Sequence, residues 1–231
     1  MYFAQQAFSA YGPSYWAVIA LFASGALLFV LVGRRQTEAQ ARRFGRLFGA
    51  VTGAIYGSAM VYSAIPFSIG SSVPLQLTDL VTAAAVYALW SQRHWAFSLT
   101  YYWGLVLSTQ ALISPVLAGP DFPSYEFLAF WAIHLLVVWA AIYLTWGRGM
   151  RPGWGSYKFA IASTVAWATV AFTFNIVAGT NYGFLNAKPV TASLLDVMGP
   201  WPVYLATGSA VLLLVWGLMT WLWQPSLRRP G

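Results

Sequence analysis

Seven long apolar runs, joined by short linkers that hold most of the prolines and charges, constrain this chain more than any other feature. Each run has roughly the 20 residues that a helix needs to cross a bilayer core. They cover about residues 14–33, 45–65, 75–91, 95–114, 126–146, 159–179 and 201–223. The alternation that marks outer-membrane strands is missing from them. The sequence therefore predicts an all-α, polytopic membrane protein: a single transmembrane domain over residues 1–231, forming a seven-helix bundle.

Composition excludes the soluble classes of protein. Hydrophobic residues make up 59% of the chain and charged residues 7%, against roughly 25% charged residues in soluble domains. The chain has no cysteine, so a disulfide and a thiolate metal site are excluded, and we expect neither a metal nor a cofactor. The net charge of +7 comes from short loops and not from one helix face, so we expect no nucleic-acid partner.

The positions of the basic residues predict the orientation in the membrane. Lys188 lies on one side of the predicted bundle, and the other lysines and arginines lie on the opposite side. These are Arg34, Arg35, Arg42, Arg43, Arg46, Arg93, Arg148, Arg151, Lys158, Arg228 and Arg229. Because cytoplasmic loops are enriched in such residues, we predict an external N-terminus and a cytoplasmic C-terminus in the cell membrane. The first run lacks a basic leader and a small-residue cleavage site, so it is predicted to be a permanent span.

The second run carries Gly49, Gly53 and Gly57 at intervals of four residues. Small residues at this spacing allow two helices to approach closely in a membrane. We therefore expect this stripe to be a packing seam.

Strongly polar groups are few inside the runs, and the predicted orientation places them in the outer half. They are Gln76, Thr78, Asp79, Gln110, His134 and Asn175. The last outer loop adds Asn181, Tyr182, Asn186, Lys188 and Asp196. Since polar groups are costly in a membrane, this asymmetry indicates a polar cavity near the outer leaflet.

His134 is the only histidine inside a run, and three interpretations are open. It is a structural hydrogen-bonding group, a base or proton relay, or a metal or haem ligand, although no second histidine lies nearby to complete a metal site. Thr78 falls in the first turn of a predicted helix, where the partial positive charge favours an oxyanion. A hydroxyl nucleophile needs an adjacent base, and His134 is the only candidate. Counting 1.5 Å per residue separates the two by about 7 Å in depth, a gap comparable to the effect of helix tilt.

Several stretches together resemble the YwaF-like family of bacterial integral membrane proteins, over about residues 45–222. They are residues 74–79, 102–115, 130–135, 179–189 and 193–202. That family is distantly similar to an animal transmembrane acyltransferase that remodels ether phospholipids and to the androgen-induced membrane hydrolases, which use a Cys or Thr nucleophile with a His. The resemblance implies that Thr78 stands at the nucleophile position and that His134 is the paired histidine. Bacterial members usually have His where this chain has Gln76, and Cys where it has Thr78, so lost activity is equally compatible with the pattern.

The leading hypothesis is a lipid-modifying acyl hydrolase or acyltransferase with membrane lipids and a fatty-acyl substrate as partners. Thr78 would attack the ester and His134 would take the proton. The predicted substrate-binding or oxyanion residues are Gln76, Asp79, Gln110, Asn175, Asn181, Tyr182 and Lys188. The alternatives are a transporter or channel for a small solute and a catalytically inactive lipid-binding protein.

Overall fold

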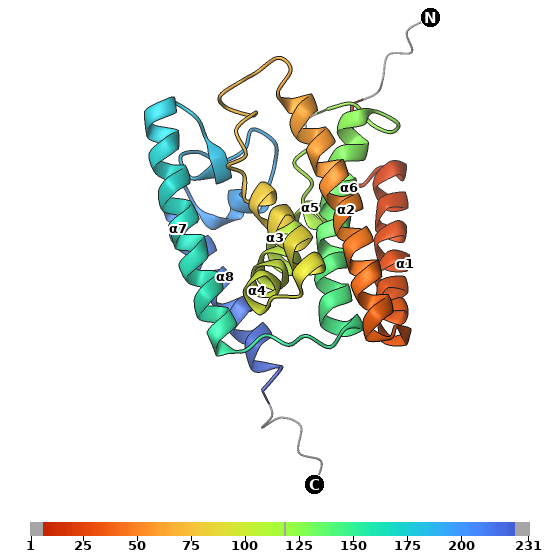
Figure 1. Ribbon diagram of the computed structural model, residues 1–231. Helices are drawn as coiled ribbons and strands as arrows, with labels where there is room; N and C mark the ends of the chain where they lie inside the picture. Colours follow the sequence, from red (N-terminus) through yellow and green to blue (C-terminus); the bar gives the residue numbers. More distant parts are fainter. Residues whose placement is uncertain (1–6, 118, 225–231) are drawn as a thin grey trace, which may run out of the picture.

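The computed structural model describes residues 7–117 and 119–224 as helices joined by short connections (Figure 1). The elements are α1 (Pro13–Arg35), α2 (Glu38–Ser63), α3 (Leu77–Ser91), α4 (His94–Tyr102), the π-helix η1 (Trp103–Ser108), α5 (Gln110–Ile113), α6 (Tyr125–Ile142), the π-helix η2 (Tyr143–Gly147), α7 (Trp154–Ala178), the 3-10 helices η3 (Tyr182–Phe184) and η4 (Leu194–Met198), and α8 (Val203–Trp221). The described residues form no strand beyond one isolated bridge, between Ala7 and Pro120. The all-α prediction is confirmed. Arg228 and Arg229 lie outside the described residues.

Four helical segments are long and apolar enough to cross a membrane. They are α1, α6 continued by η2, α7 and α8. Helix α2 begins with a polar stretch that contains Arg42, Arg43 and Arg46, and α3 has only 15 residues. The chain is therefore a multi-pass membrane protein, while the count of seven spans and the orientation stay predictions.

The helix ends differ from the predicted runs where local hydrogen bonds intervene. Helix α2 begins at Glu38 because Thr37 and Gln40 cap its first turn reciprocally. The run at 95–114 is divided into α4, η1 and α5. Between η1 and α5, the Thr109 hydroxyl donates to the carbonyls of Leu105 and Val106 at 2.7 and 3.1 Å. π-Helical turns of this kind are frequent at functional sites.

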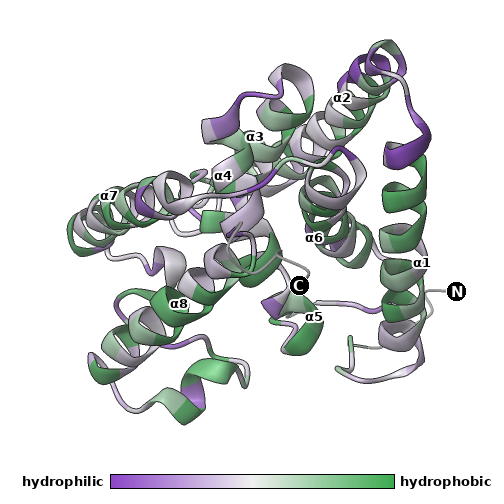
Figure 2. Ribbon diagram, turned by 90° about the horizontal axis from the view of Figure 1, so that it is seen from below, coloured by the Kyte–Doolittle hydropathy of each residue, from purple (hydrophilic) through white to green (hydrophobic). Residues whose placement is uncertain are grey.

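Helix α6 packs against α1, α2, α3 and α4, and α7 and α8 lie on the opposite side of α3 and α4 from α1 (Figures 1 and 2). In the most apolar part of α6 and η2, 61% of the residues are buried, against 17% in α1, α7 and α8. The three outer helices therefore present apolar side chains outward, as lipid-facing helices do.

Glycines set the close approach of α2 to α3. A Cβ on Gly45 would stand 2.6 Å from the carbonyl oxygen of Leu89. Gly49 and Gly53 also face α3, which confirms that part of the predicted seam. Gly57 has no atom within 4 Å of a built Cβ, so the prediction was wrong there. Helix α3 has 15 residues against 26 in α2, and α2 continues past the start of α3 (Figure 1).

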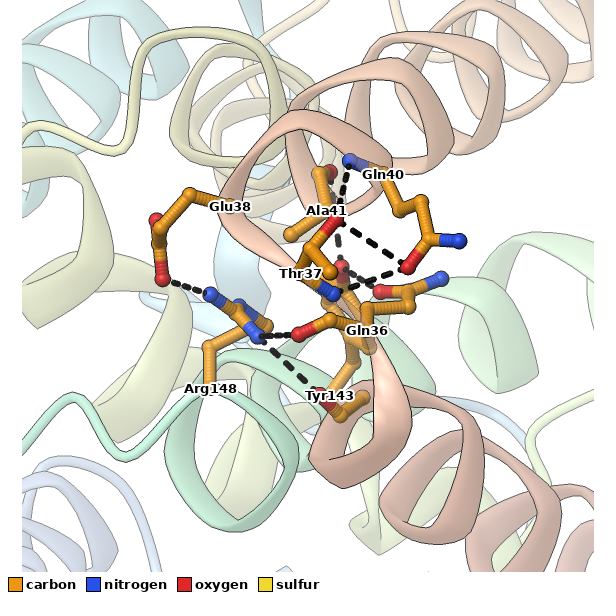
Figure 3. A network of polar contacts seen from close by, with 8 residues as sticks. Gln36, Thr37, Glu38, Gln40, Ala41, Tyr143 and Arg148 are labelled. Atoms are coloured by element: carbon orange, nitrogen blue, oxygen red, sulfur yellow. Dashed lines mark hydrogen bonds and ion pairs between the residues drawn. The ribbon is translucent and has the colours of Figure 1, made fainter.

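A polar clamp joins the helix ends at the arginine-rich end of the bundle, which carries the α1–α2 and α6–α7 connections (Figure 3). Arg148 follows η2 and donates to the carbonyls of Gly33 and Gln36 at 3.0 and 3.2 Å. It also pairs with Glu38. The carbonyls at the C-terminal end of α1 thus find a cationic partner, as helix ends require.

Candidate functional site

A cavity of about 450 Å³ lies in the half of the bundle opposite the arginine-rich end. It is bounded by the first turn of α3, by α5, by α6 and by the loop before α8. Five of the predicted site residues line it: Gln76, Thr78, Asp79, Gln110 and His134. The remaining lining residues are Leu107, Ala111, Ser114, Val116, Phe130, Ile133, Phe184, Pro189, Ser193, Leu194 and Leu195. Polar side chains that are far apart in the sequence therefore line one pocket, together with apolar side chains.

The imidazole of His134 is held in one orientation by its own helix. Its Nδ1 lies 2.7 Å from the carbonyl oxygen of Phe130, and the Phe130 ring packs at 4.4 Å between centroids. Because a carbonyl only accepts, Nδ1 must carry the proton in a neutral ring, which leaves a lone pair on Nε2. His134 thus has a structural bond and a basic nitrogen at once, and the two interpretations are compatible. Among the described residues, no cluster of three or more His, Cys, Asp or Glu side chains could hold a metal ion.

Thr78 occupies the first turn of α3. Helix α3 starts at Leu77 after Gln76 in extended conformation, and the Asp79 carboxylate accepts the Gln76 N–H at 2.9 Å. The Thr78 carbonyl accepts from the Thr82 hydroxyl. Most threonines in these helices bond back to their own helix, whereas Thr78 lines the cavity and its hydroxyl has no hydrogen-bond partner among the described residues. It is therefore available to a bound molecule.

Two amides supply donors at the same cavity. The Gln76 side-chain oxygen accepts the N–H of Gly183 at 3.1 Å, so its orientation is fixed and its NH₂ group is left for other partners. The Gln110 side chain is exposed to the cavity in the last turn before Ser114. Donors held in place before a reaction starts are the requirement for stabilising an oxyanion.

Tyr56 is a residue that the sequence reasoning missed. Its hydroxyl on α2 hydrogen-bonds to Asp79, which is 9% exposed. The carboxylate thus receives one bond from the backbone of Gln76 and one from Tyr56. Tyr56 lies between Gly53 and Gly57 on the face directed at α3, and that position was the available signal.

Ser114 and Ser193 also line the cavity without having been predicted. The Ser193 hydroxyl accepts the N–H of Leu195 and so caps η4. Both residues fall within the stretches that carry the family resemblance, 102–115 and 193–202, and that position was the available signal.

Asn175 lies outside the cavity lining and anchors the loop that follows α7. It is 2% exposed, and all of its polar atoms are bonded. Its oxygen accepts from the N–H of Tyr182 at 2.7 Å and the hydroxyl of Thr180 at 2.8 Å. Its nitrogen donates to the Tyr182 carbonyl at 3.0 Å and to Asn186 at 2.9 Å. This side chain has no donor left for a substrate.

Tyr182 connects the same loop to the segment before α3. Its hydroxyl donates to the Ile69 carbonyl at 2.8 Å and accepts the Val73 N–H at 3.1 Å. Burial raises the pKa of the Tyr182 phenol, so it keeps its proton and remains a donor. Trp167 adds a bond from its indole N–H to the Leu75 carbonyl at 2.9 Å. The first turn of α3 is therefore positioned by contacts from α7 and its loop.

Asn181 and Lys188 also make contacts within this loop. The Asn181 amide oxygen accepts from the N–H groups of Asn186 and Ala187, both at 3.1 Å. The Lys188 ammonium lies 3.8 Å from an Asp196 carboxylate oxygen and 5.8 Å from the centre of the Tyr204 ring. Of the predicted binding residues, Asn175, Asn181, Tyr182 and Lys188 are thus not brought to the cavity.

The fold and cavity define an all-α, multi-pass membrane protein with a polar pocket between its helices. The sequence model of the TMEM164 family matches residues 10–220, and the chain belongs to this family. TMEM164 is a transmembrane family, which is the part of the resemblance that is confirmed; the YwaF-like label stays a prediction. Comparison with curated proteins gave no match, and comparison with solved structures gave none either.

Proposed function

We propose that this protein is a membrane-embedded acyl hydrolase or acyltransferase acting on a lipid ester, with Thr78 as nucleophile and His134 as general base. The observation that carries the proposal is that one cavity is lined both by Thr78, whose hydroxyl has no partner among the described residues, and by His134, whose Nδ1 lies against the Phe130 carbonyl. A hydroxyl becomes a competent nucleophile when an adjacent base removes its proton. The partners are then membrane lipids and a fatty-acyl substrate, and the site of action is the cell membrane.

The proposed reaction has two steps. The Thr78 oxygen attacks the ester carbonyl carbon while its proton passes to Nε2 of His134. The tetrahedral intermediate expels the alcohol, which takes that proton, and the acyl group remains on the Thr78 oxygen. Water or the hydroxyl of a second lipid then attacks the acyl-threonine, with His134 again accepting the proton and returning it to Thr78. Water as acceptor gives hydrolysis, and a lipid hydroxyl gives acyl transfer.

The negative charge of the tetrahedral intermediate needs donors. The NH₂ groups of Gln76 and Gln110 serve this purpose, since the Gln76 amide is already fixed by Gly183. The start of α3 adds the partial positive charge of a helix N-terminus. Asp79 holds the turn through Gln76 and Tyr56. Removing one such oxyanion donor typically lowers kcat by about 10²–10³-fold.

The test uses the purified protein in lipid nanodiscs with an alkyl fluorophosphonate probe and a panel of lipid esters. Thr78→Ala and His134→Ala should each abolish turnover, and the probe should add its mass to the peptide that contains Thr78. Thr78→Ser should retain turnover because it keeps the hydroxyl. Ser114→Ala is the matched control, since it removes another hydroxyl of the same cavity and should leave probe labelling unchanged.

Full turnover in Thr78→Ala or in His134→Ala would exclude the assignment. Solute flux into liposomes without any covalent labelling would favour the transporter or channel instead. Lipid binding without labelling and without flux would favour an inactive lipid-binding protein.

A further inference from the structure

A second cavity, of about 280 Å³, adjoins the first and extends between η1, α7, η4 and α8. The two cavities share five lining residues. These are Leu107, Gln110, Phe184, Leu194 and Leu195. The space beside Thr78 and His134 is therefore bordered by the same side chains as a second space on the side of α7 and α8, two helices that lie next to each other in Figure 2.

The walls of the second cavity are chemically different from those of the first. They are mainly aliphatic and aromatic, with Leu77, Val106, Ala168, Met198, Leu205, Val211, Leu212 and Val215 among them. Thr164 bonds to the Ala160 carbonyl and to the indole of Trp103, and the Tyr204 hydroxyl donates to the Phe184 carbonyl. With these polar groups already satisfied, the lining favours an apolar occupant.

We infer that the second cavity binds the acyl chain of the lipid substrate, and that Gly208 sets how long a chain fits. The inference rests on the proposed function, because an ester whose carbonyl lies beside Thr78 must extend its acyl chain in some direction. The shared residues make the α7–α8 side the apolar continuation of the reactive pocket. Both helices are only 17% buried in their apolar parts, so the chain reaches this space from the surrounding bilayer.

Gly208 is the position on α8 where a side chain would occupy this space. It lines the second cavity, and the nearest atom to a built Cβ is the Met198 sulfur at 3.7 Å. That distance is ordinary van der Waals contact, so a small side chain is accommodated and a large one projects into the cavity. Gly217 lies on the same helix, has no atom within 4 Å of a built Cβ and does not line the cavity. It is therefore a matched control.

The experiment measures chain binding apart from turnover. The probes are esters of hexadecanoic acid and of octanoic acid, called the hexadecyl and octyl probes, each with a diazirine at the end of the acyl chain, and they are photolysed in nanodiscs. The hexadecyl probe should label peptides of η4 and α8 in the wild type and in Thr78→Ala. Gly208→Leu should weaken its binding by about fourfold for each methylene excluded, the equivalent of about 0.8 kcal/mol per methylene. Octyl binding should be unchanged, and Gly217→Leu should match the wild type for both probes.

Gly208→Ala provides a graded variant that keeps the fold, with a smaller loss for hexadecyl and none for octyl. The inference would be overturned if Gly208→Leu weakened binding of the hexadecyl and octyl probes equally, or if it left labelling by the hexadecyl probe unchanged. If labelling depends on chain length as expected while no ester is turned over, the acyl-chain site is supported and the proposed function fails. If esters are turned over with the same chain-length profile in Gly208→Leu and the wild type, the proposed function stands and the chain site is refuted.

Discussion

Replacing Asn175 tests whether the loop after α7 holds the first turn of α3 in place. In Asn175→Ala the N–H and carbonyl of Tyr182, the Thr180 hydroxyl and the Asn186 side chain all lose a partner. The net contribution of a hydrogen bond is about 1 kcal/mol, and a buried group left unpaired costs about 1–3 kcal/mol. Since part of this loop can still bond to water, we expect a loss of about 3 kcal/mol in the free energy of unfolding.

For a chain of this size, 1 kcal/mol corresponds to about 2–4 °C in Tm, so Asn175→Ala should lower Tm by about 6–12 °C. The measurement is thermal unfolding of the purified protein in nanodiscs, with probe labelling of Thr78 recorded below the transition. Asn175→Asp keeps the shape but places a carboxylate oxygen against the Tyr182 carbonyl and the Asn186 side-chain oxygen, so it should be at least as destabilising as Asn175→Ala. Asn186→Ala removes a single partner of Asn175 and is the mild control.

The same hydrogen bonds also predict how the labelling of Thr78 responds to this substitution. Displacing Tyr182 frees Ile69 and Val73 and withdraws Gly183 from Gln76. Labelling of Thr78 should therefore decrease in Asn175→Ala at temperatures where the bundle is still folded. A variant with unchanged Tm and unchanged labelling would refute the anchoring role of Asn175.

Two further predictions concern the scaffold. Gly45→Ala should destabilise the protein by about 1–3 kcal/mol, because its Cβ would meet the Leu89 backbone oxygen at 2.6 Å. Gly57→Ala has open space around its Cβ and should be neutral or stabilising by up to about 1 kcal/mol. Equal Tm values for the two variants would contradict the packing seam between α2 and α3. Arg148→Ala should lower stability by about 2 kcal/mol through loss of bonds to Gly33, Gln36 and Glu38. Arg148→Lys should recover less than half of that in the same unfolding assay, because a single ammonium lacks the fork by which Nη1 bonds the two carbonyls while Nη2 pairs with Glu38; full recovery would show that only the charge matters.

The helices were predictable from hydrophobicity where a run is long and its linkers contain prolines. Helix α8 at Val203–Trp221 and α6 with η2 at Tyr125–Gly147 agree with the predicted runs to within two residues at each end. The run at 95–114 was not predictable as α4, η1 and α5, because π-helical turns do not change the hydrophobic pattern. The start of α3 at Leu77 depends on bonds from Tyr182 and Trp167, which are distant in the sequence.

The polar residues show the limit of sequence reasoning more clearly. Depth in the membrane and chemical type were enough to group Gln76, Thr78, Asp79, Gln110 and His134, and these line one cavity. The same criteria also selected Asn175 and Tyr182, whose polar atoms are bonded within the protein. A buried polar side chain must find a partner, and a sequence does not say whether that partner is another residue or a bound molecule.

Thr78 and His134 are held in place by different parts of the bundle. The segment before α3 is bonded through Ile69, Val73 and Leu75 to the α7 side of the bundle, while His134 is fixed independently on the central helix α6. The placement of the Thr78 hydroxyl relative to the His134 ring therefore depends on bonds from α7 and its loop as well as on the direct packing of α3 against α2 and α6. Because α7 also lines the second cavity, an occupant there bears on the same helix that positions Thr78. On the proposed roles, we therefore expect chain binding in the second cavity and the placement of Thr78 to be coupled through α7, so that a change in either is detectable at the other.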